Sequence, residues 1–225
     1  MSIEHLSWDS DFFGRSIGRW RTPNIQADNL PDPAGFELIY VEVQETPEPT
    51  LKAEGWHDAG RKLTFTGPTS SAPVDDAIRT LTHRNTELEE LAWLSGHQSR
   101  YKLDPRFTDA EFKRLYTRWI DACLEGQWNA RILGLESNAQ LAGFVTVESM
   151  EDHARIGLIA VHPNHQGQGL SGRLIAAARS TAKVQGHSEL KVSTQGSNEA
   201  AINAYIHRGF KKMNSTHYYH WWVEQ

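Results

Sequence analysis

One short segment limits the folds open to this chain more than any other. An apolar run, Ile159–Val161, leads into a turn that contains Pro163. The small residues that follow and open a helical pattern are Gly167, Gly169, Ser171 and Gly172. Small residues let backbone N–H groups turn toward one point, and a helix start adds partial positive charge. A strand, a glycine-rich turn and a helix in this order predict a phosphate or pyrophosphate site, although a flexible loop explains the glycines equally well.

The neighbouring patterns narrow the alternatives. No Gly-Lys-Ser/Thr follows the glycines, which excludes a P-loop, and no ribose-binding acid follows in a βαβ unit, which disfavours a Rossmann site. β-rich runs joined by short polar turns predict an antiparallel meander; they are 131–135, 141–148 and 155–161. Helices are expected at 86–94, 108–123, 170–184 and 198–208, and strands at 77–82 and 189–193. Two of these helices have predicted capping boxes, Thr86 with Glu89 and Thr108 with Glu111. The fold class is therefore mixed α/β, a largely antiparallel sheet flanked by helices.

The first third of the chain differs from the rest in charge. Residues 1–74 hold 6 Lys and Arg against 11 Asp and Glu, so the whole net charge of -5 lies there. Strands at 37–43 and 61–66 and a short helix at 50–56 predict a small α/β piece before the polar stretch Gly67–Pro73. We expect an N-terminal domain at 1–70 and a second domain at 75–225, which ends in a strand at 216–222.

Composition excludes several classes of function. No apolar run reaches the roughly 18 residues of a membrane span, and residues 1–5 lack the pattern of a signal peptide. The single cysteine, Cys123, excludes an internal disulfide and a cysteine-based zinc cluster. No basic tract is present, which disfavours nucleic acid as a partner. We therefore expect a cytoplasmic protein without a metal and without a nucleic-acid or membrane partner.

Two motifs resemble the signatures of the GNAT N-acetyltransferases. The run Gln166-Gly167-Gln168-Gly169-Leu170-Ser171 resembles the acetyl-CoA signature Gln/Arg-x-x-Gly-x-Gly/Ala, with Ser171 in the final small position. The run from Asn198 through Tyr205 to Gly209-Phe210 resembles the second signature. The resemblance implies the GNAT fold, with a small truncated α/β domain before it, and acetyl-CoA as the co-substrate.

The resemblance also implies roles for individual residues. The strand Ile159, Ala160 and Val161 would pair with the pantetheine arm, and residues 166–171 would hold the pyrophosphate. Asn198 would contact the cofactor, and Tyr205 would protonate the departing thiolate. A Val161 N–H would stabilise the oxyanion.

Each of these roles has a simpler alternative. Asn198 could serve only as a helix cap, and Tyr205 could be a core residue packed at i+4 from Ala201. The general base stays open, because Ser193 stands where some family members have Glu. Other groups near the expected cleft are Glu148, His153 and His162, and none is preferred.

A further resemblance concerns the acceptor. Leu6–Gly14, Gln98–Tyr101 and Tyr116–Ile120 resemble family members that acetylate the amine of a nucleotide-activated amino sugar, of the dTDP-4-amino-4,6-dideoxyhexose type. Arg100 would suit the diphosphate, and Tyr101 could stack on a base or sugar; an ordinary polar loop explains both equally well. The alternatives are an acceptor such as a protein N-terminus, antibiotic or polyamine, or a CoA-binding module without catalysis. A homodimer is left open.

Overall fold

The computed structural model describes residues 2–25, 30–44, 55–137 and 139–223. The helix expected at 50–56 therefore lies almost wholly outside the described residues. The chain groups into two units; the first comprises Met1–Leu63, Gln195–Ser197 and Asn214–Gln225, and the second Thr64–Thr194 and Asn198–Met213. The expected domains, 1–70 and 75–225, stay a prediction. They differ from these units mainly because the end of the chain groups with its beginning.

The first unit is built on a small sheet. It contains β1 (Glu4–His5), α1 (Ser7–Phe13), β2 (Ile17–Thr22), β3 (Leu38–Val43) and parts of β4 (Trp56–Pro68) and β10 (Lys211–Trp222). β2 runs parallel to β3, while β1 is antiparallel to β2 and β10 is antiparallel to β3. Its core cluster consists of Trp20, Ile39, Val41, Val43 and Tyr219. The strands predicted at 37–43, 61–66 and 216–222 are confirmed, and the last two are longer than expected.

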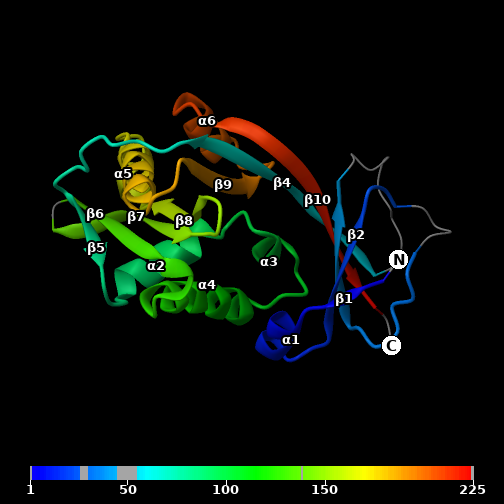
Figure 1. The fold of residues 1–225 in the computed structure, drawn as a ribbon. Helices are drawn as coiled ribbons and strands as arrows, with labels where there is room; N and C mark the ends of the chain where they lie inside the picture. Colours follow the sequence, from blue (N-terminus) through cyan, green and yellow to red (C-terminus); the bar gives the residue numbers. More distant parts are fainter. Residues whose placement is uncertain (1, 26–29, 45–54, 138, 224–225) are drawn as a thin grey trace. The chain divides into compact units, whose positions relative to one another are not determined.

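The second unit contains a mixed sheet in the order β4-β9-β8-β7-β6-β5 (Figure 1). The strands not yet introduced are β5 (Ile78–Leu81), β6 (Arg131–Ser137), β7 (Gln140–Ser149), β8 (Ala154–Val161) and β9 (Glu189–Gln195). β5, β6, β7 and β8 are antiparallel to their neighbours in turn, and β8 is parallel to β9. The predicted meander and the mixed, largely antiparallel fold class are therefore confirmed.

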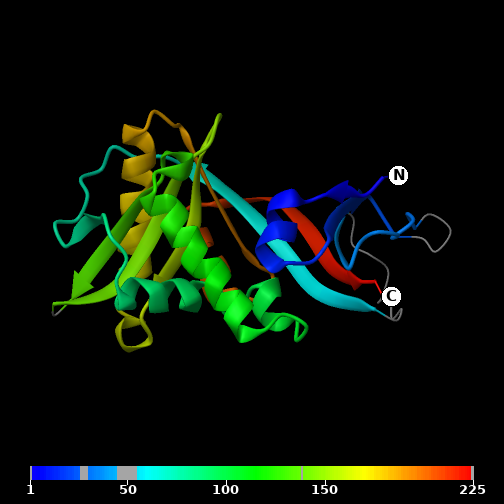
Figure 2. The ribbon, with the colours of Figure 1, turned by 90° about the horizontal axis from the view of Figure 1, so that it is seen from below.

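Helices cover both faces of this sheet. They are α2 (Thr86–Ser95), α3 (Arg100–Leu103), α4 (Asp109–Leu124), α5 (Leu170–Val184) and α6 (Glu199–His207), with 3₁₀ turns η2 (Gln127–Asn129) and η3 (Pro163–His165). α2 and α4 lie on one face of β6–β8, and α5 lies on the other (Figures 1 and 2). On β7, Glu148 meets Trp119 of α4, while a Cβ at Gly143 would meet Leu174 of α5. Burial on both faces explains why β7 reads as an almost continuous apolar run.

The helix α4 forms as its sequence predicts. Thr108 Oγ1 accepts from the Glu111 N–H at 3.1 Å, and the Glu111 carboxylate accepts from the Thr108 N–H at 2.7 Å, which completes the capping box. The buried stripe consists of Phe112, Leu115, Tyr116, Ile120 and Cys123, with Trp119 half-buried beside it. An apolar stripe at this spacing fixes the face that α4 turns to the sheet.

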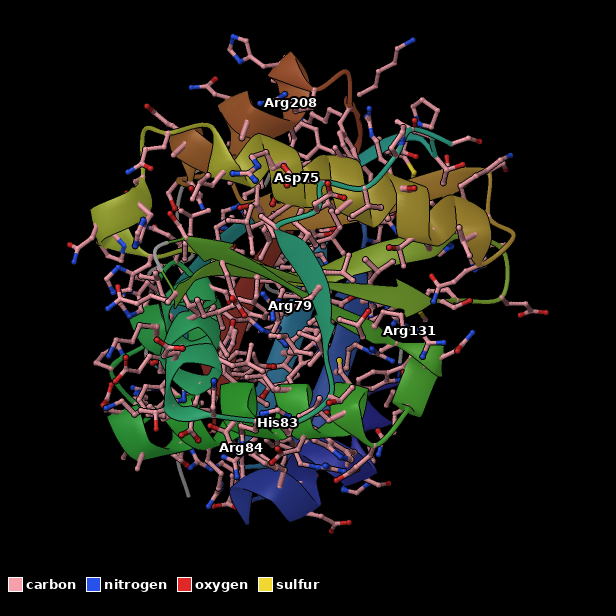
Figure 3. All side chains as sticks on the ribbon, turned by 90° about the vertical axis from the view of Figure 1, so that its left-hand side faces the viewer. Asp75, Arg79, His83, Arg84, Arg131 and Arg208 are labelled. Carbon is pink, nitrogen blue, oxygen red and sulfur yellow. The ribbon has the colours of Figure 1, made fainter. Side chains whose placement is uncertain are left out.

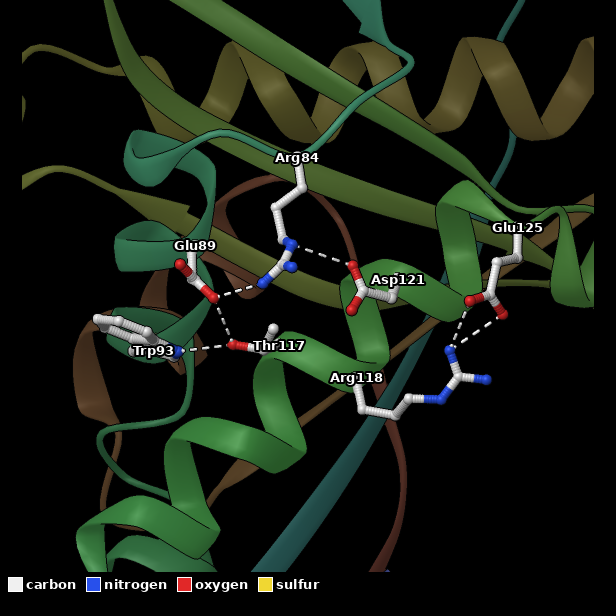
Figure 4. Close-up of polar contacts among 7 residues, drawn as sticks. All are labelled: Arg84, Glu89, Trp93, Thr117, Arg118, Asp121 and Glu125. Carbon is white, nitrogen blue, oxygen red and sulfur yellow. Dashed lines mark hydrogen bonds and ion pairs between the residues drawn. The ribbon is translucent and has the colours of Figure 1, made fainter.

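The capping box predicted for α2 is wrong. Asn85, not Thr86, caps the helix: its Oδ1 accepts from the Leu88 N–H at 2.9 Å. The Glu89 carboxylate instead accepts from Arg84 at 2.6 Å and from Thr117 of α4 at 3.0 Å (Figure 4). Asn85 precedes Thr86 in the sequence and is at least as good a cap. The cap therefore lies one residue earlier than the Thr–Glu spacing indicated, and Thr86 is the first residue of the helix.

Candidate active site

The site begins where two parallel strands part. β8 pairs with β9 from Ala154–Leu190 to Ile156–Val192, and the pairing stops there. The remainder of β8, up to Val161, keeps its pairing with β7 only. The His162 N–H donates to the Ala142 carbonyl of β7 at 2.8 Å, so strand alternation turns the Val161 N–H to the opposite edge. That edge of β8 can accept an extended ligand as an additional strand.

The glycine-rich turn follows at the end of β8. Gly167 and Gly169 both have φ of +75°, a left-handed conformation that side chains rarely adopt. Gly169 is the N-cap of α5, and no side chain caps this helix. The first N–H groups of α5 therefore have no intrahelical partner and lie at the positive end of the helix. Gln166 donates from Nε2 to the Val161 carbonyl at 3.2 Å and joins the turn to the strand.

A cavity of about 390 Å³ joins these features. Nearly all residues predicted to bind the cofactor line it: Ile159, Ala160, Val161, Gln166, Gly167, Gly169, Leu170, Ser171 and Asn198. Gln168 is the exception. Residues that the sequence did not indicate complete the lining, namely Leu94, Ser95, His165, Ile175, Ala200, Ala201 and Ala204. Leu94 and Ser95 come from α2, more than 60 residues earlier in the chain, and only tertiary packing brings them here.

The second signature lies on α6 beside the same cavity. Asn198 Oδ1 accepts from the Ala201 N–H at 3.1 Å, so this residue is a helix cap and also lines the cavity. Tyr205 lines the cavity as well, although its ring is 3% exposed and lies beside Phe65 and Phe210. Burial raises the pKa of Tyr205 well above the usual value of a phenol. The phenol is therefore protonated at neutral pH and is able to give a proton.

Arg100 and Tyr101 lie apart from this lining, on the short helix α3. The Arg100 guanidinium stands 4.8 Å from the Tyr101 ring centroid and donates to the Tyr101 hydroxyl at 2.8 Å. The next residue, Lys102, lines a second cavity of about 360 Å³. Leu94 borders both cavities, and His162 of the second cavity follows Val161 of the first. The two cavities are therefore neighbours.

The three groups considered as general bases have different surroundings. Glu148 is fully buried and accepts from Trp119 Nε1 at 2.9 Å and from Arg155 Nε at 2.8 Å. His153 is hydrogen-bonded to Asp152, and His162 Nδ1 accepts from the Asn164 N–H at 3.3 Å. None of the three lines the first cavity.

The described residues contain neither a candidate metal site nor a helix that could span a membrane. Within residues 2–25, 30–44, 55–137 and 139–223, no group of three or more His, Cys, Asp and Glu side chains could hold a metal ion. Over the same residues, no helix combines the length and apolar character needed to span a bilayer.

Comparisons with known proteins agree with this geometry. A family model described as the acetyltransferase (GNAT) family matches residues 83–210, more than half of the chain. A dTDP-fucosamine acetyltransferase of Escherichia coli O6:H1 is 26% identical over 224 residues, which cover 97% of this chain and 96% of the relative. The spore coat polysaccharide biosynthesis protein SpsD of Bacillus subtilis is 29% identical over 133 residues, 59% of this chain and 46% of that protein.

Solved structures agree on the fold. The crystal structure of a GNAT-family acetyltransferase from Novosphingobium aromaticivorans superposes with a TM-score of 0.54 at 19% identity. The match covers 83% of this chain and 75% of that one. At this identity the likeness concerns the fold alone.

Proposed function

The chain belongs to the GNAT acetyltransferase family, and from that premise we propose that it transfers the acetyl group of acetyl-CoA to the amine of a nucleotide-activated amino sugar. The observation that carries the proposal is the single cavity that joins the open edge of β8, the glycine-rich turn and Tyr205. The sugar acceptor is supported by the nearly full-length similarity to a dTDP-fucosamine acetyltransferase. We propose a 4-amino-4,6-dideoxyhexose linked to dTDP as the acceptor class and the cytoplasm as the location.

The donor would lie along β8. Its pantetheine arm would pair with the free edge at Ile159–Val161, and its pyrophosphate would accept from N–H groups of the turn at Gln166–Ser171. Asn198 would contact the same molecule from the start of α6. All residues of this turn except Gln168 border the cavity together with the strand, which supports one continuous binding path.

The reaction would be a direct transfer. The acceptor nitrogen attacks the thioester carbon, a C–N bond forms, and the oxyanion accepts from the Val161 N–H. The C–S bond then breaks, the nitrogen gives its proton to water, the thiolate takes a proton from Tyr205, and the Tyr205 phenolate takes one back from water. Holding both reactants in one site removes much of the entropic barrier. The acid role is supported by the position of Tyr205 in the cavity lining beside the open edge of β8, whereas burial raises its pKa and keeps the phenol protonated at neutral pH.

The acceptor would reach the cavity from the side of α3. Arg100 would contact the diphosphate and Tyr101 the base or sugar. The support is their position immediately before Lys102, two residues for Arg100 and one for Tyr101, because Lys102 lines the neighbouring cavity. A substitution of Arg100 by Gln is expected to raise the KM for the sugar nucleotide without changing the KM for acetyl-CoA.

A thiol-release assay tests the proposal directly. We would measure CoA release from acetyl-CoA with a panel of dTDP- and UDP-linked amino sugars, and with peptides and polyamines as alternative acceptors. Turnover on a dTDP-linked amino sugar is the expected result. Turnover on peptides or polyamines alone would overturn the sugar assignment, and CoA binding without turnover on any amine would favour a non-catalytic module.

The variant Tyr205→Phe tests the acid. We expect unchanged acetyl-CoA affinity and a kcat lowered by about 10²–10⁴-fold, the usual contribution of a positioned acid. The ring still packs against Phe65, so the fold should be retained. Turnover equal to the wild type across the pH range would exclude this role.

A further inference from the structure

One arginine lies on the helix that would receive the pyrophosphate. Arg208 directly follows the last turn of α6, and its guanidinium lies against Gly172 in the first turn of α5. A Cβ at Gly172 would overlap the Nη2 and Cζ atoms of Arg208. The glycine therefore leaves room for the arginine, although glycine costs about 1 kcal/mol relative to alanine within a helix. Figure 3 shows Arg208 beside α5.

The Arg208 side chain is exposed. Within the part of the chain that the structure describes, no carboxylate pairs with Arg208, whereas Arg173 in the same turn of α5 is paired with Asp75 at 2.5 Å. A second cation, Arg179, lies nearby: its burial, and to a smaller extent repulsion from Arg208, lowers the pKa of Arg179. Arg208 ends α6, where a cation is favourable, and it also lies beside the start of α5, where an anion is favoured. The arrangement suits an anionic ligand.

The position of Arg208 on α6 relates it to the cavity. Ala201, Ala204 and Tyr205 line the cavity and lie seven, four and three residues before Arg208, so all four share one side of the helix. No Asp, Glu, Lys or Arg side chain contributes to the cavity lining itself. A polyanionic donor would therefore depend on cations outside the lining, and Arg208 is one that lies against the first turn of α5.

We propose that Arg208 binds a phosphate group of the CoA moiety, as the side-chain complement to the backbone N–H groups of the glycine-rich turn. The inference rests on acetyl-CoA as the donor in the proposed function. A guanidinium can form two parallel hydrogen bonds to one phosphate. Both sources of phosphate in CoA, the pyrophosphate and the 3′-phosphate, carry this chemistry.

Equilibrium binding tests the inference without depending on turnover. We would titrate CoA and 3′-dephospho-CoA calorimetrically, and pantetheine by ligand-observed NMR, into wild type, Arg208→Gln, Arg208→Lys and the control Arg131→Gln. Arg131 is an exposed arginine on β6 that lies apart from Arg208 in Figure 3. Losing charge-assisted hydrogen bonds should weaken CoA binding by Arg208→Gln about 10- to 100-fold. Arg208→Lys should fall between this variant and the wild type, because it keeps the charge but not the paired geometry.

The outcomes separate cleanly. Weaker CoA binding by Arg208→Gln with unchanged pantetheine binding supports the inference. If Arg208→Gln also weakens the binding of 3′-dephospho-CoA, the phosphate that Arg208 binds is in the pyrophosphate. If Arg208→Gln binds 3′-dephospho-CoA as tightly as the wild type does, it is the 3′-phosphate. Unchanged CoA affinity in Arg208→Gln, or an equal loss for pantetheine or in the Arg131→Gln control, would overturn this inference alone. A wild-type protein that does not bind CoA would overturn the proposed donor and this inference with it.

Discussion

The substitution Gly157→Ala should be unusually costly for a single methyl group. A Cβ at Gly157 would overlap Oε1 of Glu148 and lie 2.7 Å from its Cδ and 2.9 Å from Thr146 Oγ1. Glu148 is fully buried and is held by Trp119 and Arg155, so its carboxylate cannot move aside without losing a hydrogen bond. Gly157 follows Ile156, the last residue of β8 that pairs with β9, so the strain arises at the edge of the candidate site.

The size of the effect follows from three contributions. Loss of one hydrogen bond to a charged group costs about 1.5–3 kcal/mol. An added methyl group in a filled site costs about 1–3 kcal/mol. In the opposite direction, alanine has less backbone entropy than glycine in the unfolded chain, which stabilises the folded protein by about 0.5–1 kcal/mol. The free energy of unfolding should therefore fall by about 2–5 kcal/mol. Urea titration followed by tryptophan fluorescence measures this loss.

A double-mutant cycle isolates the cause. Glu148→Ala removes the carboxylate that the new methyl group meets, so adding Gly157→Ala in that background should cost much less and leave only the contact with Thr146 Oγ1. Gly196→Ala is a matched control, since its Cβ would meet only ordinary contacts at 3.4 Å. If Gly157→Ala costs the same with and without Glu148, or less than about 0.5 kcal/mol in the native background, the packing argument is wrong.

Three further perturbations have definite expected outcomes. Thr108→Ala removes the cap of α4 and should lower the free energy of unfolding by about 1 kcal/mol, with Thr108→Asp restoring most of it; an unchanged urea midpoint would contradict this. Burial raises the pKa of the Cys123 thiol to about 12, so the native protein should react with a disulfide reagent at pH 8 only as fast as it unfolds; immediate titration of one thiol per chain would refute it. Arg173 holds the pKa of Asp75 at about 2, below the usual 3.8. The stability from this pair should be complete above pH 3.8 and disappear as the pH falls through 2, and Asp75→Asn should flatten this part of the stability curve; an identical curve for the variant would exclude the linkage.

The elements that the sequence predicted well are those whose signals are local. The capping box at Thr108 and the apolar stripe after it identified α4, and the glycines at 167 and 169 identified the start of α5. The capping box at Thr86 failed because Asn85 competes for the same role one residue earlier. Local sequence patterns predict that a helix is present, but they do not distinguish which of two adjacent residues caps it.

Some residues of the candidate site could likewise be predicted from local sequence, and others could not. Residues of the two signatures could be predicted to lie at the site because each signature is a contiguous run of sequence. In the structure most members of each signature border one cavity. Leu94, which closes the cavity from α2, could not, since only packing of α2 against β8 brings it there. The sequence of the second signature does not single out Arg208. Its proposed role follows only from the packing of its guanidinium against Gly172, a residue on another helix.

The first unit also has a consequence for how the chain reaches its folded state. β3 is paired on one side with β10, so Leu38 lies opposite Trp222, a residue 184 positions later. During synthesis, most of the second unit leaves the ribosome before that partner strand exists. Until β10 is synthesised, one edge of β3 therefore stays unpaired, and strands with an unpaired edge can associate with other chains. In nascent chains that end at residue 210 and are joined to the ribosome by a linker long enough to clear the exit tunnel, the second unit should accordingly resist proteolysis while the first remains cleavable.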